Sequence, residues 1–220
     1  MALSTGNPSR RKFLQGGLAA SAGLLASGVP GIANAAPTGP RWVMVIDLNR
    51  CIGCQSCVLA CKGVRDVPGK FRTSINIGED SKRKAATFTP VQCNQCSEPA
   101  CAAVCKSKAL GVAPDGVVRL NKELCVSCGE CVSACPFQAI YKDDTNGGKA
   151  DKCQFCRDVT ADGVPACVTA CASHARLFGD ENNPGEELAR ALKRKDLKPA
   201  KAGVPGAFRV LYLPLTTKGA

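Results

Sequence analysis

Sixteen cysteines in four compact groups are the residues of this sequence whose type and spacing could do chemistry. Groups one and three repeat the spacing C-x2-C-x2-C-x3-C, while groups two and four lengthen one gap and keep the final C-x3-C. No cysteine falls outside the four groups. The members are Cys51, Cys54, Cys57 and Cys61 in group one; Cys93, Cys96, Cys101 and Cys105 in group two; Cys125, Cys128, Cys131 and Cys135 in group three; and Cys153, Cys156, Cys167 and Cys171 in group four.

This spacing suits a cubane cluster of four irons and four sulfides. Three closely spaced thiolates on a tight loop can bind three corners of one cube, and the backbone N–H groups of the loop stabilise its negative charge. The fourth cysteine lies about one helical turn further on. In bacterial two-cluster ferredoxins, whose cysteine run ends in a proline as group three does at Pro136, that cysteine binds the other cluster. We therefore expect four 4Fe–4S clusters, with the groups working in pairs.

Three other uses of the cysteines compete with this interpretation. Exported proteins form disulfides, but cysteines so close along the chain bridge poorly. Zinc also accepts four thiolates, although its sites typically come as two separated C-x2-C pairs. A 3Fe–4S cluster usually goes with a missing ligand, and none is missing here. A structural zinc protein therefore remains an alternative to a carrier of four clusters.

The composition favours clusters as part of the interior. Aromatic residues make up 5% of the chain, so something else must fill the core. The formal charge of +11 at first suggests a nucleic-acid or membrane-surface partner. Residues 1–35 carry three basic residues and no acidic ones, and without them the formal charge is +8. Four clusters with ionised thiolates add roughly −8. The basic excess is then a counter-charge for cofactors, and we expect no nucleic-acid partner.

The first 35 residues indicate an export signal. The segment SRRKFL (residues 9–14) is a twin-arginine signature, a mildly apolar stretch follows over residues 16–29, and Ala33-Asn34-Ala35 supplies a small-x-small cleavage pattern. The apolar stretch is short and rich in Gly and Ser for a membrane anchor, which is the alternative. The twin-arginine route carries folded proteins, so the clusters could be inserted before export. We expect a periplasmic protein that is peripheral to the inner membrane through its partners.

The remaining chain predicts an α+β fold of two interleaved ferredoxin-like modules, of βαββαβ type, with long irregular loops. Groups two and three would form an inner module over residues 91–139. Groups one and four would form an outer module over residues 41–90 and 140–195, and residues 196–220 would be a C-terminal extension. The gap between groups three and four is also of ferredoxin length, so the spacing alone leaves the pairing open.

Secondary structure is expected to be short. We expect strands over residues 42–48, 117–120, 140–141 and 208–215, and helices over residues 58–63, 102–107, 132–135 and 168–172, each after the third cysteine of a group. A further helix over residues 185–195 would be capped by Asn183-Pro184. Residues 64–83 are expected to be irregular.

Several segments resemble the electron-transfer B subunits of the molybdopterin oxidoreductase superfamily, the dimethyl sulfoxide, polysulfide, thiosulfate and tetrathionate reductase type. The resemblance covers residues 41–195. Among members, the export signal, the segment IGCQSC (residues 52–57) and the segment ARLFGD (residues 175–180) are most similar to tetrathionate reductase B subunits. Two positions depart from many relatives, which place proline where this chain has Lys106 and Ala172. The matching segments are residues 50–57, 71–73, 125–136, 150–156, 165–167 and 175–180.

The resemblance also implies which cysteines share a cluster. It assigns Cys51, Cys54, Cys57 and Cys171 to cluster 1; Cys93, Cys96, Cys101 and Cys135 to cluster 2; Cys125, Cys128, Cys131 and Cys105 to cluster 3; and Cys153, Cys156, Cys167 and Cys61 to cluster 4. It implies two partners, a molybdopterin-containing catalytic subunit and a polytopic quinone-reacting membrane subunit.

The expected function is electron transfer between those two partners in anaerobic respiration. An electron-accepting subunit of a formate dehydrogenase or hydrogenase-type complex is the alternative within the same class. No nucleophile–base pair, phosphate-binding loop or open metal position is visible, so we expect no catalytic residues and no direct small-molecule substrate. Lys62 and Lys106 each follow a fourth cysteine and are either cations that raise a cluster potential or solvated side chains. His174 is not expected to be a ligand.

Overall fold

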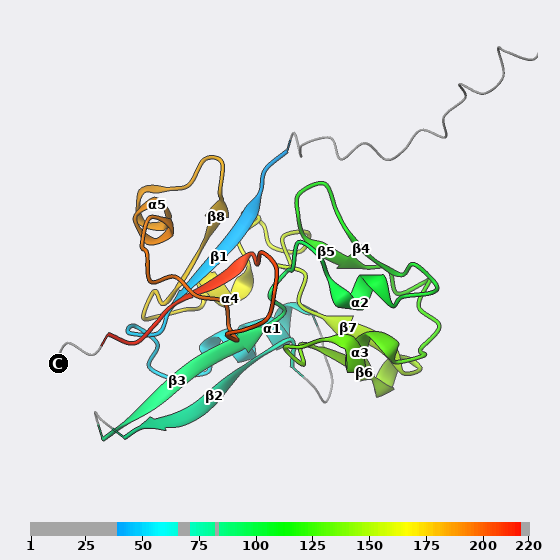
Figure 1. Ribbon diagram of the computed structural model, residues 1–220, viewed down its shortest axis with the longest axis horizontal. Helices are drawn as coiled ribbons and strands as arrows, with labels where there is room; N and C mark the ends of the chain where they lie inside the picture. The colour runs from blue at the N-terminus through cyan, green and yellow to red at the C-terminus, as the bar shows by residue number, and fades with distance from the viewer. Residues whose placement is uncertain (1–38, 66–70, 82–83, 217–220) are drawn as a thin grey trace, which may run out of the picture. The chain divides into compact units, whose positions relative to one another are not determined.

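The structure is a computed structural model that describes residues 39–65, 71–81 and 84–216. The chain divides into residues 1–36 and residues 37–220, and every described residue belongs to the second part. The predicted export signal therefore lies outside the described residues. Within the second part, short helices and small sheets alternate along the chain (Figure 1).

The helices and strands are short, and most of the sheets have two strands. The helices are α1 (Ser56–Arg65), α2 (Ala100–Ala103), α3 (Glu130–Ala134), α4 (Ala166–Thr169) and α5 (Glu186–Leu192), with one 3-10 turn at Asp144–Asn146. The strands are β1 (Trp42–Asp47), β2 (Thr73–Asp80), β3 (Ala85–Gln92), β4 (Leu110–Val112), β5 (Val118–Leu120), β6 (Ile140–Asp143), β7 (Lys149–Lys152), β8 (Arg176–Asp180) and β9 (Val210–Leu213).

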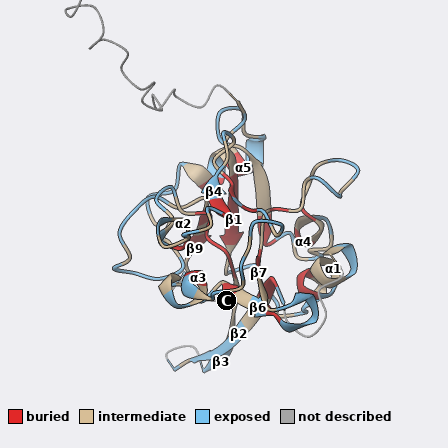
Figure 2. Cartoon of the chain, turned by 90° about the vertical axis from the view of Figure 1, so that its right-hand side faces the viewer, coloured by how far each residue is buried: buried red, intermediate tan, exposed pale blue. Residues whose placement is uncertain are grey.

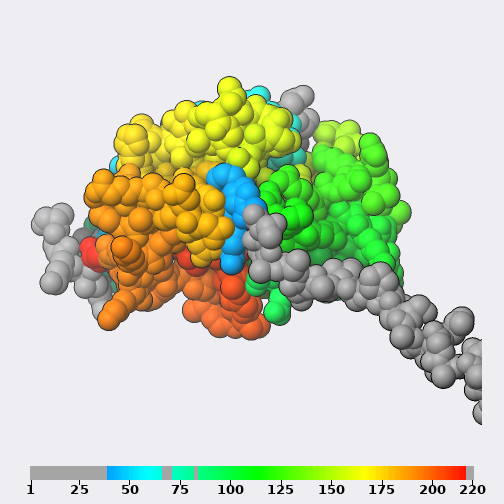
Figure 3. Space-filling model, turned by 90° about the horizontal axis from the view of Figure 1, so that it is seen from above, coloured from blue at the N-terminus to red at the C-terminus, as the bar shows by residue number. Residues whose placement is uncertain are grey.

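Strand β1 is the centre of a three-stranded sheet in the order β8-β1-β9, antiparallel to β8 and parallel to β9. Its sequence is apolar at almost every position because both of its faces are covered. Met44 and Ile46 pack on one face with cysteines and Tyr212, while Val43 and Val45 pack on the other face against α5. Figure 2 shows β1 as a buried strand, and Figure 3 shows it between α5 and the segment that carries β4 and β5. Residues beyond 196 thus contribute β9 to this sheet.

The helices that carry the third cysteines pack in pairs, α1 with α4 and α2 with α3. All four begin earlier than the sequence predicted, at the residue before the third cysteine rather than after it. Pro99 and Pro165 stand at the N-caps of α2 and α4, where their carbonyl oxygens accept the first hydrogen bonds of each helix. Gly129, with φ of 83°, starts α3 in the same place.

A β-hairpin replaces part of the predicted irregular segment. Strand β2 pairs with β3 in an unbroken antiparallel register from Thr73 opposite Gln92 to Asp80 opposite Ala85. The prediction over residues 64–83 was wrong for β2 because Gly78, Glu79 and Asp80 disfavour strands, and only the partner strand satisfies their backbone groups. Residues 66–70 and 82–83 lie outside the described residues.

Helix α5 is shorter than predicted. Its N-cap is Gly185, which makes no side-chain cap hydrogen bond, so the predicted cap at Asn183-Pro184 was wrong. The two-stranded units β4–β5 and β6–β7 agree with the predicted strands at residues 117–120 and 140–141. In the part of the chain that the structure describes, no helix is long and apolar enough to cross a membrane.

Candidate metal centres

The sixteen cysteines are all free thiols, and the fold gathers them across the groups. Three enclosed cavities are each lined by four cysteines, three from one sequence group and the fourth from another. We call these sets quartets. Quartet 1 is Cys51, Cys54, Cys57 and Cys171; quartet 3 is Cys125, Cys128, Cys131 and Cys105; and quartet 4 is Cys153, Cys156, Cys167 and Cys61.

Quartet 2 consists of the four remaining cysteines. Burial, and after it the neighbouring thiols of Cys93 and Cys135, raise the pKa of Cys96 to about 11. Burial together with Cys93, Cys135 and Cys96 also raises the pKa of Cys101 to about 12, against an opposing effect of Lys152. The four thiols therefore lie close enough to feel one another's charge.

The four thiols of each of these three quartets line a cavity rather than meeting at one point. A tetrahedral zinc site instead draws its four sulfurs to about 2.3 Å from one ion. Among the described residues, no three His, Cys, Asp or Glu side chains converge closely enough to hold one metal ion. The all-thiolate donor sets, spread around each cavity, fit 4Fe–4S clusters.

A left-handed backbone residue precedes the second cysteine of every group. These residues are Gly53, Gln95, Ser127 and Phe155, with φ between 49° and 71°. In groups one and four this bend brings the N–H of Gly53 to the Cys51 thiol and that of Phe155 to the Cys153 thiol, as in an anion-binding nest. At Gly53 a side chain is also excluded, because an added Cβ would lie 2.4 Å from the Phe88 ring. The loops are thereby shaped to enclose negative charge.

A second repeated turn follows the fourth cysteine of groups two, three and four. Lys108, Gln138 and His174 each have a positive φ, and each donates its N–H to the carbonyl oxygen of the cysteine three residues before. The following N–H then points at the thiol: that of Ala139 lies 3.4 Å from Cys135 Sγ, and that of Ala175 lies 3.3 Å from Cys171 Sγ. Such N–H···S hydrogen bonds stabilise an ionised cysteine.

Burial opposes ionisation at several of the cysteine thiols. Burial raises the pKa of Cys51 and Cys131, and neighbouring thiols add to this effect. Burial also raises the pKa of Cys167, to about 11, against the opposing effect of the Arg176 guanidinium. At the surface, a hydrogen bond with Ser56 lowers the pKa of Cys54. Because the ligating form is the thiolate, loading such sites releases protons.

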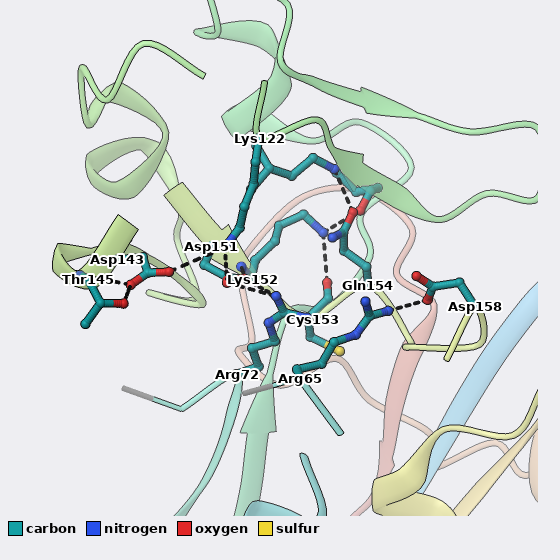
Figure 4. A network of polar contacts seen from close by, with 12 residues as sticks. Arg65, Arg72, Lys122, Asp143, Thr145, Asp151, Lys152, Cys153, Gln154 and Asp158 are labelled. Carbon is teal, nitrogen blue, oxygen red and sulfur yellow. Dashed lines mark hydrogen bonds and ion pairs between the residues drawn. The ribbon is translucent and has the colours of Figure 1, made fainter. Parts of the chain in front are cut away.

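Buried cations surround the quartets, and sequence reasoning missed them. Arg72 lines the quartet 4 cavity and pairs with the buried Asp151 carboxylate at 2.7 Å, which Lys122 also approaches at 2.8 Å (Figure 4). Lys152 is fully buried and donates to the carbonyl oxygens of Val118 and Cys153. The signal available in the sequence was that Arg72 and Lys152 stand in segments that resemble the B subunits, residues 71–73 and 150–156.

Arg176 is the cation closest to the thiols. It is 3% exposed, and its guanidinium lies 3.6 Å from Cys57 Sγ and 3.7 Å from Cys167 Sγ. Burial opposes its charge, but the Cys167 and Cys57 thiols raise the pKa of Arg176 overall.

The residues that the sequence singled out as tuning candidates lie elsewhere. Lys62 places its ammonium 4.8 Å from the centre of the Phe71 ring, and Lys106 is exposed. His174 is exposed and takes part in the turn described above.

Thiols arranged in crossed quartets of this kind define a ferredoxin-type iron–sulfur protein. Comparison with known families agrees: residues 84–181 match a 4Fe–4S dicluster domain, and residues 42–63 match a 4Fe–4S binding domain.

The relatives narrow the class further, since they include the B subunits of several reductases. That of tetrathionate reductase from Salmonella typhimurium is 37% identical over 222 residues, covering 91% of this chain and 87% of the relative. That of polysulfide reductase from Wolinella succinogenes is 36% identical, over 74% of this chain and 88% of the relative. The thiosulfate reductase electron transfer subunit PhsB of Salmonella typhi is also 36% identical, over 77% of this chain and 92% of the relative. The protein belongs to this family of 4Fe–4S electron-transfer B subunits.

The buried ion pairs beside quartet 4 generate a stability prediction. Asp151→Asn should lower the free energy of unfolding by about 3–5 kcal/mol, because it leaves the buried Arg72 without its counter-charge. Chemical unfolding of the anaerobically purified protein measures this. The control is Glu186→Gln, which breaks an exposed pair with Arg190 and should cost about 0.5 kcal/mol or less. Equal effects of the two substitutions would contradict the prediction.

Proposed function

We propose that this chain carries four 4Fe–4S clusters and passes electrons between a molybdopterin-containing catalytic subunit and a quinone-reacting membrane subunit. The observation that carries the proposal is the crossing of the quartets, in which the fourth cysteines of groups one, two and four line cavities whose other three cysteines belong to another group. This crossing ties neighbouring sites together, as electron transfer over short steps requires. The clusters supply the one-electron chemistry when bound, and the protein holds them at fixed spacing.

The contacts between quartets support a linear order. Arg176 touches one cysteine of quartet 1 and one of quartet 4. Cys153 of quartet 4 is close enough to Cys93 of quartet 2 to feel its charge. Quartets 2 and 3 share groups two and three. The order is therefore quartet 1, quartet 4, quartet 2, quartet 3.

The two ends of this order are the most accessible. Cys54 of quartet 1 and Cys128 of quartet 3 are the exposed thiols among the sixteen. Beside them, Ile52 is 62% exposed and Val126 is 68% exposed. Electrons would enter at one of these ends and leave at the other, where an apolar loop can seat a partner and exclude water. The interior quartets would then serve only as relays.

We also propose that the fold is two interleaved ferredoxin-like modules, one built on groups one and four and the other on groups two and three. The pairing of α1 with α4 and of α2 with α3 supports this division. The similarity to subunits of tetrathionate, polysulfide and thiosulfate reductases favours a sulfur-compound reductase as the complex that this subunit serves.

Metal analysis tests the proposal directly. Protein purified anaerobically should contain about sixteen irons per chain and absorb broadly in the visible region. Zinc in place of iron, with no visible absorption, would support the structural zinc alternative instead. Folded protein without either metal would end both accounts.

The crossing of the quartets has its own test. Cys61→Ala together with Cys167→Ala removes two ligands of the same proposed cluster, so iron should fall by about four per chain. Cys57→Ala together with Cys61→Ala removes two ligands from one sequence group but from two quartets, so iron should fall by about eight. If the group-one pair costs no more iron than the crossed pair, each group binds its own cluster and the crossing is refuted.

We propose that the chain is exported folded to the periplasm by the twin-arginine route. Replacing Arg10 and Arg11 with lysines should retain the iron-loaded protein in the cytoplasm, because that route requires the arginine pair. Fractionation followed by immunoblotting measures the distribution. A variant that still reached the periplasm would exclude this route.

A further inference from the structure

Arg176 occupies a position that the same turn fills with aliphatic side chains elsewhere in the chain. The segments CKSKAL (residues 105–110), CPFQAI (residues 135–140) and CASHAR (residues 171–176) each run from a fourth cysteine, through the left-handed turn and an alanine, to the first residue of a strand. In the first two copies this residue is Leu110, 6% exposed, or Ile140, 3% exposed. The turn therefore accepts an apolar side chain here, and the charge of Arg176 is not needed to form it.

The surroundings of Arg176 fix its guanidinium between two quartets. Nη2 lies 3.6 Å from Cys57 Sγ of quartet 1, and Nη1 lies 3.7 Å from Cys167 Sγ of quartet 4. Gln92 Oε1, at 2.5 Å, and Thr73 Oγ1, at 3.0 Å, accept its other hydrogen bonds. The side chain has few alternative orientations, since both ends of the guanidinium fork are held.

The charge of Arg176 lacks an ordinary partner. Within the described ranges no carboxylate forms an ion pair with it, and its neighbours are thiols, an amide, a hydroxyl and the Met44 thioether. Burying an arginine without a counter-charge costs several kcal/mol. Negative charge at the two adjoining quartets would meet that cost, because each loaded site carries ionised thiolates.

We propose that Arg176 is a shared counter-cation for the sites of quartets 1 and 4 and raises the reduction potential of both. This inference rests on the proposed function. Each site gains one negative charge when it accepts one electron, and a fixed cation in a low-dielectric interior stabilises the more negative form. Because the guanidinium lies between the two sites, it also weakens the repulsion between them when both are reduced.

The experiment replaces Arg176 with leucine, the residue at the equivalent position of the turn after Cys105, Leu110. Redox titration of the loaded protein with dithionite, followed by electron paramagnetic resonance, gives the potential of each site. In Arg176→Leu, the reduction potentials of two of the four sites should fall. The equilibrium constant for reducing each of these two sites should drop at least about tenfold, which is about 59 mV for one electron. Arg176→Lys keeps the charge and should shift them less. Lys106→Ala removes an exposed cation beside a fourth cysteine and should leave all four potentials unchanged, because solvent screens it.

Iron content separates the two possible failures. If the wild-type protein lacks sixteen irons, the proposed function fails before Arg176 is tested. If Arg176→Leu retains its iron and all four potentials, the inference about Arg176 is overturned while the proposed function stands.

A second measurement applies where Arg176→Leu does not retain iron. Wild-type protein labelled with ¹⁵N-arginine should show ¹⁵N hyperfine couplings on two reduced sites. The coupling on the quartet 1 site, whose cavity is lined by Arg176 and by no other described arginine, should disappear in Arg176→Lys. Labelled wild-type protein without such couplings would overturn the inference.

Discussion

The structure depends on compensating negative charge inside a small protein. Ionised thiolates and the sites they form are stable in a dry interior only when donors and cations surround them. The backbone supplies part of this compensation through inward-turned N–H groups in the cysteine loops. Side chains supply the rest, since Arg72, Lys152 and Arg176 are all buried within reach of cysteines. The basic excess in the composition is therefore partly a property of the core, which is unusual for charged residues.

One local device is used repeatedly to build these surroundings. A left-handed residue shapes each loop before its second cysteine, and a second left-handed residue turns the chain after the fourth cysteine of three groups. The second turn brings an alanine N–H to the sulfur and starts a strand with the next residue. Group one departs from this pattern because α1 continues past Cys61 to Arg65. Cys61 therefore lies on α1 itself, which packs against α4, and its thiol lines the quartet 4 cavity.

The cysteine loops and the strands β1, β5, β6 and β9 were predictable because their signals are local. Three closely spaced cysteines fix a loop whatever surrounds it, and the apolar run of β1 indicates a strand covered on both faces. The β2–β3 hairpin was not predictable from β2 alone, since its residues Gly78 to Asp80 disfavour a strand and the cross-strand pairing decides. The burial of Arg72, Lys152 and Arg176 was not predicted for a related reason. A charged residue in a sequence is ordinarily a solvated one, and only the packing distinguishes Arg176 from Lys106.

The sheet explains why the cation that touches two quartets comes from β8 and not from a lysine beside a cysteine. Arg176 pairs with Ile46 of β1, the strand that leads into the first cysteine loop, and it directly follows the turn of Cys171. Its backbone is thus tied both to quartet 1 and to the most buried strand of the protein. Lys62 and Lys106 are nearer to cysteines along the chain, but nothing fixes their ammonium groups at a sulfur. A charge affects a buried site in proportion to how dry and how fixed its position is, and the β8–β1 pairing provides both conditions.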